Sequence, residues 1–273
     1  MASQIIFLGT AGDSSVTSRQ LRGSGGIILR VDDSQFHLDP GPGTLIQAKN
    51  HNLNLRANTA ILISHAHLNH CNDINTVIDA MTLSGLDKSG VLIANKTVIN
   101  GDDNYNSYLT NHHRNLLEKT ITLNKGQKVA VELVEIHALS ADHTDPEAIG
   151  FKLFCPRFTL SYSGDTKYHK QLVDEMIGSD ILILNVPYPG DKSQNLNLDT
   201  ESAIKIISKV QPRLAVITHF GLEMLKADPL IEAREIQKQT GIQTIAAKDG
   251  LVISPESYAA KSPQIRLSGF VKE

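Results

Sequence analysis

The first half of the chain alternates short apolar runs with turn residues, a pattern typical of β-strands. Apolar residues at spacings of three and four predict a helix over Asp73–Leu83, and a short helix is expected from Thr44 to Lys49. The polar stretch Asn100–Asn115 follows neither pattern and is predicted to be an irregular loop. The apolar runs predict strands over Ile5–Leu8, Gly26–Val31, Gln35–Leu38, Ala60–Ser64 and Val91–Ala94.

The second half repeats this mixture of strands and helices. Strands are predicted over Thr120–Leu123, Lys128–His137, Ala148–Phe154, Phe158–Ser163, Asp180–Val186, Leu214–Thr218, Thr244–Ala246 and Leu251–Ile253. Helices are predicted over Lys167–Ile177, Thr200–Val210 and Pro229–Thr240. Two similar halves without a linker predict one α/β domain over residues 1–273. The expected architecture is two sheets packed face to face with helices outside, a four-layer αββα sandwich.

Composition narrows the function. The 273 residues carry a net charge of −3, which does not favour binding to a phosphate backbone, so a nucleic-acid partner is not expected. Two cysteines cannot form a disulfide framework. The chain has neither a signal-peptide pattern at its start nor an apolar run long enough to span a bilayer, which predicts a cytoplasmic protein without a membrane partner.

Histidines cluster in the segment Ser64-His65-Ala66-His67-Leu68-Asn69-His70, directly after a predicted buried strand. Imidazole is the commonest transition-metal ligand among side chains. Residues two apart in an extended segment point the same way, so His65 and His67 can reach one ion, while His70 can turn toward a neighbouring ion. The alternative is a set of solvent-facing histidines on a loop, but so dense a cluster after a buried strand favours a metal site.

Three further candidates lie at predicted strand ends: His143, Asp165 and His219. Each is a weak signal alone, because a single histidine at a strand end is more often structural. Together with the first cluster they form a set of six ligands that could hold two ions, with Asp165 bridging them.

These motifs resemble those of the metallo-β-lactamase superfamily, in particular its ribonuclease Z and phosphodiesterase branch. The resemblance rests on the His-x-His-x-x-His motif, on the later single His143, and on the segments Phe7-Leu8-Gly9-Thr10, Leu38-Asp39-Pro40-Gly41-Pro42-Gly43, Ser163-Gly164-Asp165-Thr166 and Thr218-His219-Phe220-Gly221. It implies the αββα fold, one or two zinc ions (or Mn²⁺ or Fe²⁺), and hydrolysis by a metal-bound hydroxide.

The sequence departs from the family pattern at two positions. The family motif is His-x-His-x-Asp-His, and here Asn69 stands in place of the aspartate that ligates the second metal. An amide offers a neutral oxygen but cannot act as a base, so the chemistry would depend on Asp165, with Asn69 as a second candidate catalytic residue and metal ligand. A weakened two-metal site, a one-metal enzyme and an inactive site all remain open.

The second departure concerns ribonuclease Z, which has a histidine where this chain has Asn197. The interval from His143 to Asp165 is also too short for the tRNA-gripping arm of that enzyme. We therefore expect a hydrolase of a small-molecule phosphodiester or other ester, such as a lactone. The alternatives are a vestigial metal-binding protein of the same fold and a nucleic-acid processing nuclease.

Other expectations concern the surroundings of the site. The loops Gly12–Gly25 and Asn100–Arg114 are predicted to form the pocket rim. His37 is expected to be structural and Cys71 to serve packing. A homodimer is compatible with this sequence.

Overall fold

The computed structural model describes residues 2–192 and 196–259 and contains two seven-stranded β-sheets. The first sheet has the order β14 (Val252–Ile253), β1 (Gln4–Phe7), β2 (Ile27–Val31), β3 (Ser34–Leu38), β4 (Asn58–Ile63), β5 (Val91–Ala94) and β6 (Lys119–Thr122). The second has the order β13 (Thr244–Ala246), β12 (Leu214–Thr218), β11 (Ile181–Asn185), β10 (Thr159–Tyr162), β9 (Ile149–Phe154), β8 (Val134–Ser140) and β7 (Lys128–Val131).

The two sheets have the same pattern of strand directions. In the first, the pairs from β14 to β3 are antiparallel and those from β3 to β6 are parallel. In the second, the pairs from β7 to β10 are antiparallel and those from β10 to β13 are parallel. Strands β3 and β10 therefore occupy equivalent positions, each at the change from antiparallel to parallel pairing.

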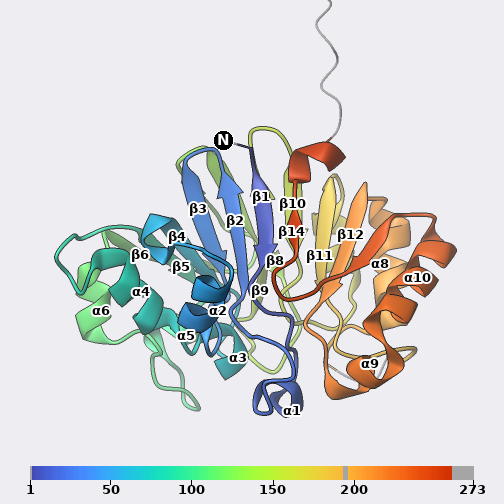
Figure 1. Ribbon diagram of the computed structural model, residues 1–273, viewed down its shortest axis with the longest axis horizontal. Coiled ribbons are helices and arrows are strands. Elements are labelled where there is room, and N and C mark those ends of the chain that lie inside the picture. Colours follow the sequence, from blue (N-terminus) through green and yellow to red (C-terminus); the bar gives the residue numbers. More distant parts are fainter. Residues whose placement is uncertain (1, 193–195, 260–273) are drawn as a thin grey trace, which may run out of the picture.

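Helices cover the outer face of each sheet, as Figure 1 shows, with α2, α4, α5 and α6 on one flank and α8 and α10 on the other. The helices are α1 (Ser14–Thr17), α2 (Thr44–Asn50), α3 (Leu68–Cys71), α4 (Ile74–Thr82), α5 (Lys96–Asn100), α6 (Asn111–Leu116), α7 (Lys170–Met176), α8 (Thr200–Val210), α9 (Leu222–Ala227) and α10 (Pro229–Thr240). Two short 3-10 helices, η1 (Leu55–Ala57) and η2 (Pro255–Tyr258), complete the described elements. The predicted αββα sandwich is confirmed.

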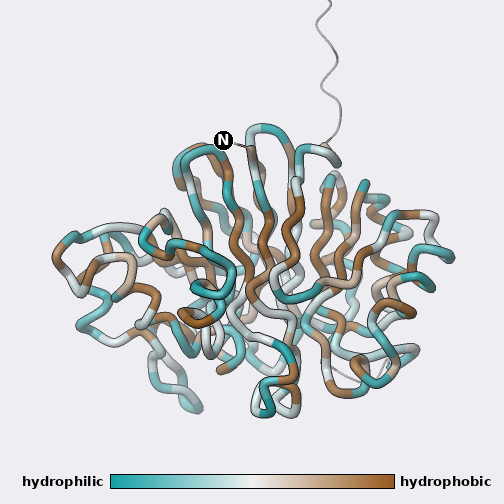
Figure 2. The backbone as a smooth tube through the Cα atoms, viewed as in Figure 1, coloured by the Kyte–Doolittle hydropathy of each residue, from teal (hydrophilic) through white to brown (hydrophobic). Residues whose placement is uncertain are grey.

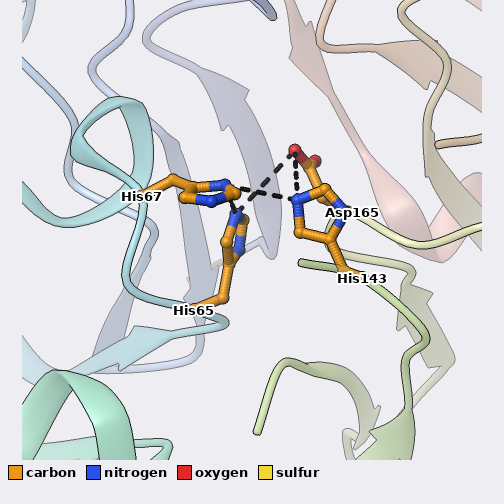
Figure 3. Close-up of side chains that lie close together, drawn as sticks. All are labelled: His65, His67, His143 and Asp165. Carbon is orange, nitrogen blue, oxygen red and sulfur yellow. Dashed lines mark hydrogen bonds and ion pairs between the residues drawn. The ribbon is translucent and has the colours of Figure 1, made fainter. Parts of the chain in front are cut away.

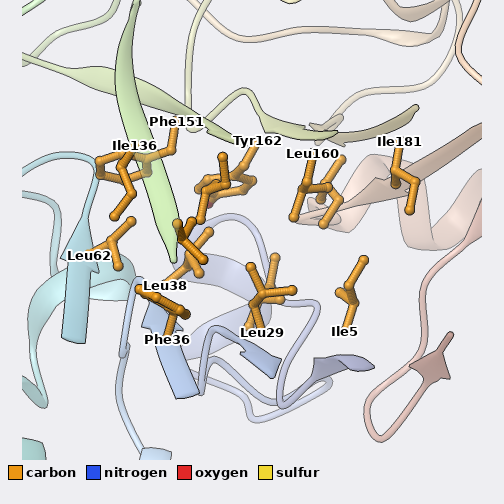
Figure 4. Packing of buried hydrophobic residues seen from close by; sticks show 14 of the residues in the cluster. Ile5, Leu29, Phe36, Leu38, Leu62, Ile136, Phe151, Leu160, Tyr162 and Ile181 are labelled. Carbon is orange, nitrogen blue, oxygen red and sulfur yellow. The ribbon is translucent and has the colours of Figure 1, made fainter. Parts of the chain in front are cut away.

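Three apolar clusters hold these layers together. The central cluster lies between the sheets, where Leu29 and Phe36 of the first face Phe151 and Leu160 of the second (Figure 4). The other two clusters join each sheet to its own helices. The strands are accordingly mostly apolar along their length, and the polar residues gather in loops and on the outer helix faces (Figure 2). Within the described ranges, none of the helices has the length and apolar character needed to cross a bilayer.

The structure corrects three details of the sequence prediction. The stretch Lys128–His137 is a hairpin of β7 and β8 and not one strand, with Glu132 at the turn in a left-handed conformation (φ 51°). The stretch Asn100–Asn115 includes most of helix α6, whose start is capped by the Thr110 hydroxyl. Helix α9 was not predicted, because its apolar residues lie close to the Gly221 turn and form no long periodic pattern.

Candidate metal centre

Four side chains that come from both sheets gather their ligand atoms at one edge of the sandwich. His65 and His67 follow β4, His143 follows β8, and Asp165 follows β10. Their candidate ligand atoms all lie within 4.8 Å of one another and point toward a common centre (Figure 3). The Nδ1 atom of His67 lies 3.0 Å from Nε2 of His65 and 3.2 Å from Nε2 of His143. Three nitrogens and one carboxylate oxygen are a donor set that fits a divalent transition metal.

A second group of ligand atoms adjoins the first and consists of His70, Asp165 and His219. One oxygen of Asp165, Oδ2, lies 3.4 Å from Nε2 of His70, and the other, Oδ1, lies 3.5 Å from Nε2 of His219. Oδ2 also lies 3.8 Å from Nε2 of His65 in the first group. Asp165 therefore belongs to both groups, and its role as a bridge between two ions stays a prediction.

Asp39 belongs to neither ligand group but holds the histidine segment in position through hydrogen bonds. Its carboxylate accepts hydrogen bonds from the backbone N–H and the hydroxyl of Ser64 (both 2.7 Å), from the Tyr162 hydroxyl (2.7 Å) and from Nδ1 of His70 (2.9 Å). Because Nδ1 of His70 donates to Asp39, its Nε2 is turned toward Asp165. The sequence analysis named this aspartate only within the segment 38–43 that carries the family resemblance, although its place at the end of a predicted strand was a usable signal.

Asp145 provides a second support. Its carboxylate accepts hydrogen bonds from the backbone N–H of Ala66 (3.0 Å), from the Asn95 amide (2.8 Å) and from the Thr97 hydroxyl (3.1 Å). The peptide between His65 and His67 is thereby tied to the loop that follows β5. This residue was also missed, because its role depends on contacts that are distant in the sequence.

Asn69 lies at the second group, but its amide nitrogen is the atom that contacts the site. Nδ2 donates a hydrogen bond to the Gly12 carbonyl (2.7 Å) and lies 3.0 Å from Nε2 of His219. A carbonyl oxygen can only accept, so Gly12 selects the NH₂ end of the amide. This orientation differs from the expectation that Asn69 offers its oxygen to a second ion.

Burial and the neighbouring carboxylates together set the protonation state of the histidines. Burial lowers the pKa of His65 well below its ordinary value and lowers the pKa of His219 to about 4, so both rings are neutral at pH 7. Burial also acts against protonation of His70, but the negative charge of Asp165 and hydrogen bonds to Asp165 and Asp39 outweigh it and raise the pKa of His70 to about 10. A cation bound in the second group would therefore displace a proton from His70.

The charge of Asp165 is maintained by its neighbours. Burial alone would raise the pKa of its carboxyl group, but the nearby His219 and His70 hold that pKa well below its usual range. Asn185, at the end of β11, donates a hydrogen bond from Nδ2 to Oδ1 of Asp165 (2.7 Å) and fixes the carboxylate.

A pocket of about 300 Å³ opens beside both ligand groups. The first loop proposed for its rim contributes Gly12, Asp13 and Ser14. The second proposed loop, Asn100–Arg114, contributes no lining residue, because it packs on α4, where Asn75 donates to the Tyr108 carbonyl (2.7 Å). The rim is completed instead by residues of the connection between β11 and α8, most of which the sequence analysis did not single out: Pro187, Tyr188 and Asn197.

Two residues set aside as structural have buried positions. His37 is fully buried in β3, and its Nε2 lies 2.8 Å from the Gly25 carbonyl. Cys71 packs in the cluster between the first sheet and its helices. Both predictions are confirmed.

Comparisons with known proteins agree with this architecture. The chain is 30% identical to the uncharacterized protein MJ1374 of Methanocaldococcus jannaschii over 255 residues, which covers 93% of this chain and 95% of that protein. The metallo-beta-lactamase fold protein YhfI from Bacillus subtilis matches with a TM-score of 0.77 and 15% identity, covering 93% of this chain and 99% of that one. The short form of human tRNase Z matches with a TM-score of 0.66 and 18% identity, covering 92% and 98%. The sequence profile of the beta-lactamase superfamily domain matches residues 34–220. The chain therefore belongs to the metallo-β-lactamase superfamily.

Proposed function

We propose that this protein is a metal-dependent hydrolase that cleaves a phosphodiester or another ester, such as a lactone. The observation that carries the proposal is the position of Asp165, whose carboxylate lies near His70 and His219 of the second group and also 3.8 Å from Nε2 of His65 in the first, beside an open pocket of about 300 Å³. Zinc is the metal that we expect, since histidine nitrogens and a carboxylate are its usual ligands. A bound divalent ion would supply Lewis acidity and lower the pKa of water.

The chain's own residues have distinct parts in this proposal. His65, His67 and His143 form the tighter metal site, with Asp165 as the anionic ligand shared with the second. Asn69 supplies an N–H donor where relatives supply a carboxylate, so the second site is held by His70, His219 and Asp165 and is the weaker one. Hydrolysis is consequently slow and depends on Asp165 as the one carboxylate of the two groups.

A small substrate is favoured over tRNA for two reasons. The segment between His143 and Asp165 is occupied by the antiparallel strands β9 and β10, joined by a short turn in which the Cys155 N–H donates to the Phe158 carbonyl (3.0 Å). Asn197 lines the pocket and has no ionisable proton to give to a leaving group. The fold shared with tRNase Z supports phosphate esters as one substrate class. The uncharged side chains of Tyr188 and Asn197 on the rim support a neutral ester as a second class.

The test combines metal analysis with turnover. Purified protein would be loaded with zinc or manganese, its metal content measured, and hydrolysis of a nitrophenyl phosphodiester and of a simple lactone followed. We expect at least one tightly bound metal per chain and slow turnover of one of these substrates. His67→Ala should lose the metal and the activity, whereas His112→Ala, at an exposed position in α6, should keep both. Metal binding without turnover of either substrate would favour a non-catalytic metal-binding protein.

A further inference from the structure

A small cavity adjoins the second ligand group and shares Asn69 and His219 with the lining of the open pocket. Its volume is about 30 Å³, and its lining includes His70, His219, Asp39, Tyr162 and Asn185. Ser24, from the glycine-rich loop before β2, also lines the cavity. These six residues are at most 8% exposed, so the side chains that line the cavity are buried.

Three buried polar atoms of the lining residues have no hydrogen-bond partner among the described residues: Oγ of Ser24, Oδ1 of Asn185 and Nδ1 of His219. Buried polar groups in folded proteins are almost always paired, with protein atoms or with ordered water. That the three residues which carry these atoms all line one cavity points to a common partner within it.

The hydrogen-bond roles of these atoms are complementary. The Gly12 carbonyl fixes the Asn69 amide so that Nδ2 donates toward Nε2 of His219 (3.0 Å). Nε2 of His219 must then be the unprotonated nitrogen, and Nδ1 carries the hydrogen into the cavity. Oδ1 of Asn185 can only accept, and the Ser24 hydroxyl can donate or accept. One donor, one acceptor and one hydroxyl are the partners that a water molecule needs.

Among the histidines of the two groups, His219 differs in that one of its ring nitrogens, Nδ1, has no hydrogen-bond partner among the described residues. Protein atoms bind the outward nitrogen of His65 (Ser64 hydroxyl, 2.9 Å), of His70 (Asp39, 2.9 Å) and of His143 (Leu196 carbonyl, 2.8 Å). Thr144 does so for Nε2 of His67, at 3.1 Å. Such outer partners fix the tautomer and orientation of a ligand histidine, so that His219 requires one from elsewhere.

We propose that this cavity is a buried water-binding site that positions His219. A water needs roughly 10–15 Å³ of such volume, so the cavity has room for about two. One accepts the hydrogen of His219 Nδ1 and donates to Oδ1 of Asn185, with the Ser24 hydroxyl as a further partner. Since Nδ2 of Asn185 donates to Asp165, the water connects His219 with Asp165, two members of the second ligand group. The water site itself does not depend on the proposed hydrolase function.

The first test is a crystal structure of the metal-free protein at a resolution that shows ordered water. We expect electron density for one or two waters within hydrogen-bond distance of Nδ1 of His219 and Oδ1 of Asn185. In two-dimensional NMR spectra of ¹⁵N-labelled protein, the ring of His219 should carry its hydrogen on Nδ1. A cavity without density, or a hydrogen on Nε2, would overturn the proposal.

The second test fills the cavity. Ser24→Val replaces the hydroxyl by methyl groups and should expel the water, so that affinity for the second metal, measured by competition with a chromophoric chelator, falls by roughly 10- to 100-fold, the range for losing an outer partner. Ser24→Ala leaves the space and should cost only a few-fold. Ser18→Val, at an exposed serine, is the control. Unchanged affinity in Ser24→Val would contradict the positioning role. A protein that binds no metal at all would refute the proposed function but leave the crystallographic and NMR test of the water intact.

Discussion

Asp39 and Asp165 follow β3 and β10, the strands that occupy the same position in the two sheets, yet their carboxylates have different surroundings. Asp39 is enclosed by four donors at 2.7 to 2.9 Å, two of them from Ser64. The shortest contact of Asp165 is the hydrogen bond that it accepts from Asn185 (2.7 Å), and imidazole nitrogens face its carboxylate at 3.4 to 3.9 Å.

The difference shows how one residue type at equivalent strand ends can have two functions. The lone pairs of Asp39 are already used by protein donors, so this carboxylate can only hold its neighbours in place. The lone pairs of Asp165 face nitrogens that can share a cation with it. The surroundings of each carboxylate, and not its position in the sheet, decide whether it holds its neighbours in place or is left open to share a cation.

The largest effect is expected from Asp165→Asn. The amide keeps the shape but removes the charge that both ligand groups share, so metal content should fall strongly and turnover by about a thousandfold or more. Metal content per chain and hydrolysis of the nitrophenyl phosphodiester would be measured together. Because the Asn185 hydrogen bond can be kept by the amide oxygen, urea unfolding of the metal-free protein should change less than for Asp39→Asn. Full metal content in Asp165→Asn would show that metal binding does not need this carboxylate, contrary to the contrast drawn with Asp39.

Asp39→Asn should instead act on stability. An amide at this position turns an NH₂ group toward a donor and leaves Ser64, Tyr162 or His70 without an acceptor, which should lower the free energy of unfolding by about 3 kcal/mol. Urea titration of the metal-free variant, beside Asp33→Asn at the turn between β2 and β3, would measure the difference. A variant as stable as the wild type, but unable to bind metal, would assign Asp39 the role that we give to Asp165.

A third expectation concerns His37, a buried histidine in β3, close to Asp39 in the sequence. Burial lowers the pKa of His37 to about 4, whereas in the unfolded chain it titrates near 6.5. Between these values the unfolded state binds the additional proton, so stability is lost as the pH falls from about 6.5 toward 4, by roughly 3 kcal/mol for this residue.

His37→Gln removes this titration while retaining an N–H donor for the Gly25 carbonyl. Its free energy of unfolding, measured by urea titration between pH 7 and pH 4, should therefore fall less steeply than that of the wild type. His112→Gln, at an exposed position, should follow the wild-type curve. Parallel curves for His37→Gln and wild type would show that His37 is protonated in the fold.

Asn69→Asp should have the smallest effect. It should lower the stability of the metal-free protein but raise the affinity for the second metal. The new carboxylate would lie against the Gly12 carbonyl, which now accepts at 2.7 Å, so the metal-free protein should lose about 1 kcal/mol. A cation would relieve this repulsion, and affinity for the second metal should rise roughly tenfold. Isothermal titration with zinc would separate the two binding events. Equal occupancy of both sites in the wild-type protein would contradict the weak second site.

The main elements of the fold could be predicted because the apolar runs of the strands are short and well separated by turns. Four candidate ligands could be singled out because they lie in the histidine segment or follow a predicted strand: His65, His67, Asp165 and His219. The supports Asp39, Asp145 and Asn185 could not be assigned, since their partners lie in other strands and loops. The same limit applies to the amide of Asn69, whose orientation depends on a backbone carbonyl 57 positions away.

The pocket rim shows a further limit of the sequence. The polar segment Asn100–Arg114 has the composition of a rim loop, but Asn75 of α4 binds it through the Tyr108 carbonyl and through the N–H of Thr110. Tyr188 and Asn197, which do line the pocket, lie in the connection between β11 and α8, where no periodic pattern marks them as rim residues. Tertiary packing, and not local composition, decides which loop reaches the site.

The distribution of the ligands over both sheets has a consequence for the folding of the chain. His70 and His219 are 149 positions apart, and their nitrogens meet only when both sheets are formed and packed. A cation bound by both would act as a cross-link between the halves of the molecule and would stabilise the complete fold but neither half alone. At a free concentration a thousandfold above the dissociation constant this contributes about 4 kcal/mol. The thermal stability of this protein would then depend on the metal supply of its surroundings. Loss of metal would loosen the packing of one sheet on the other before either sheet unfolded.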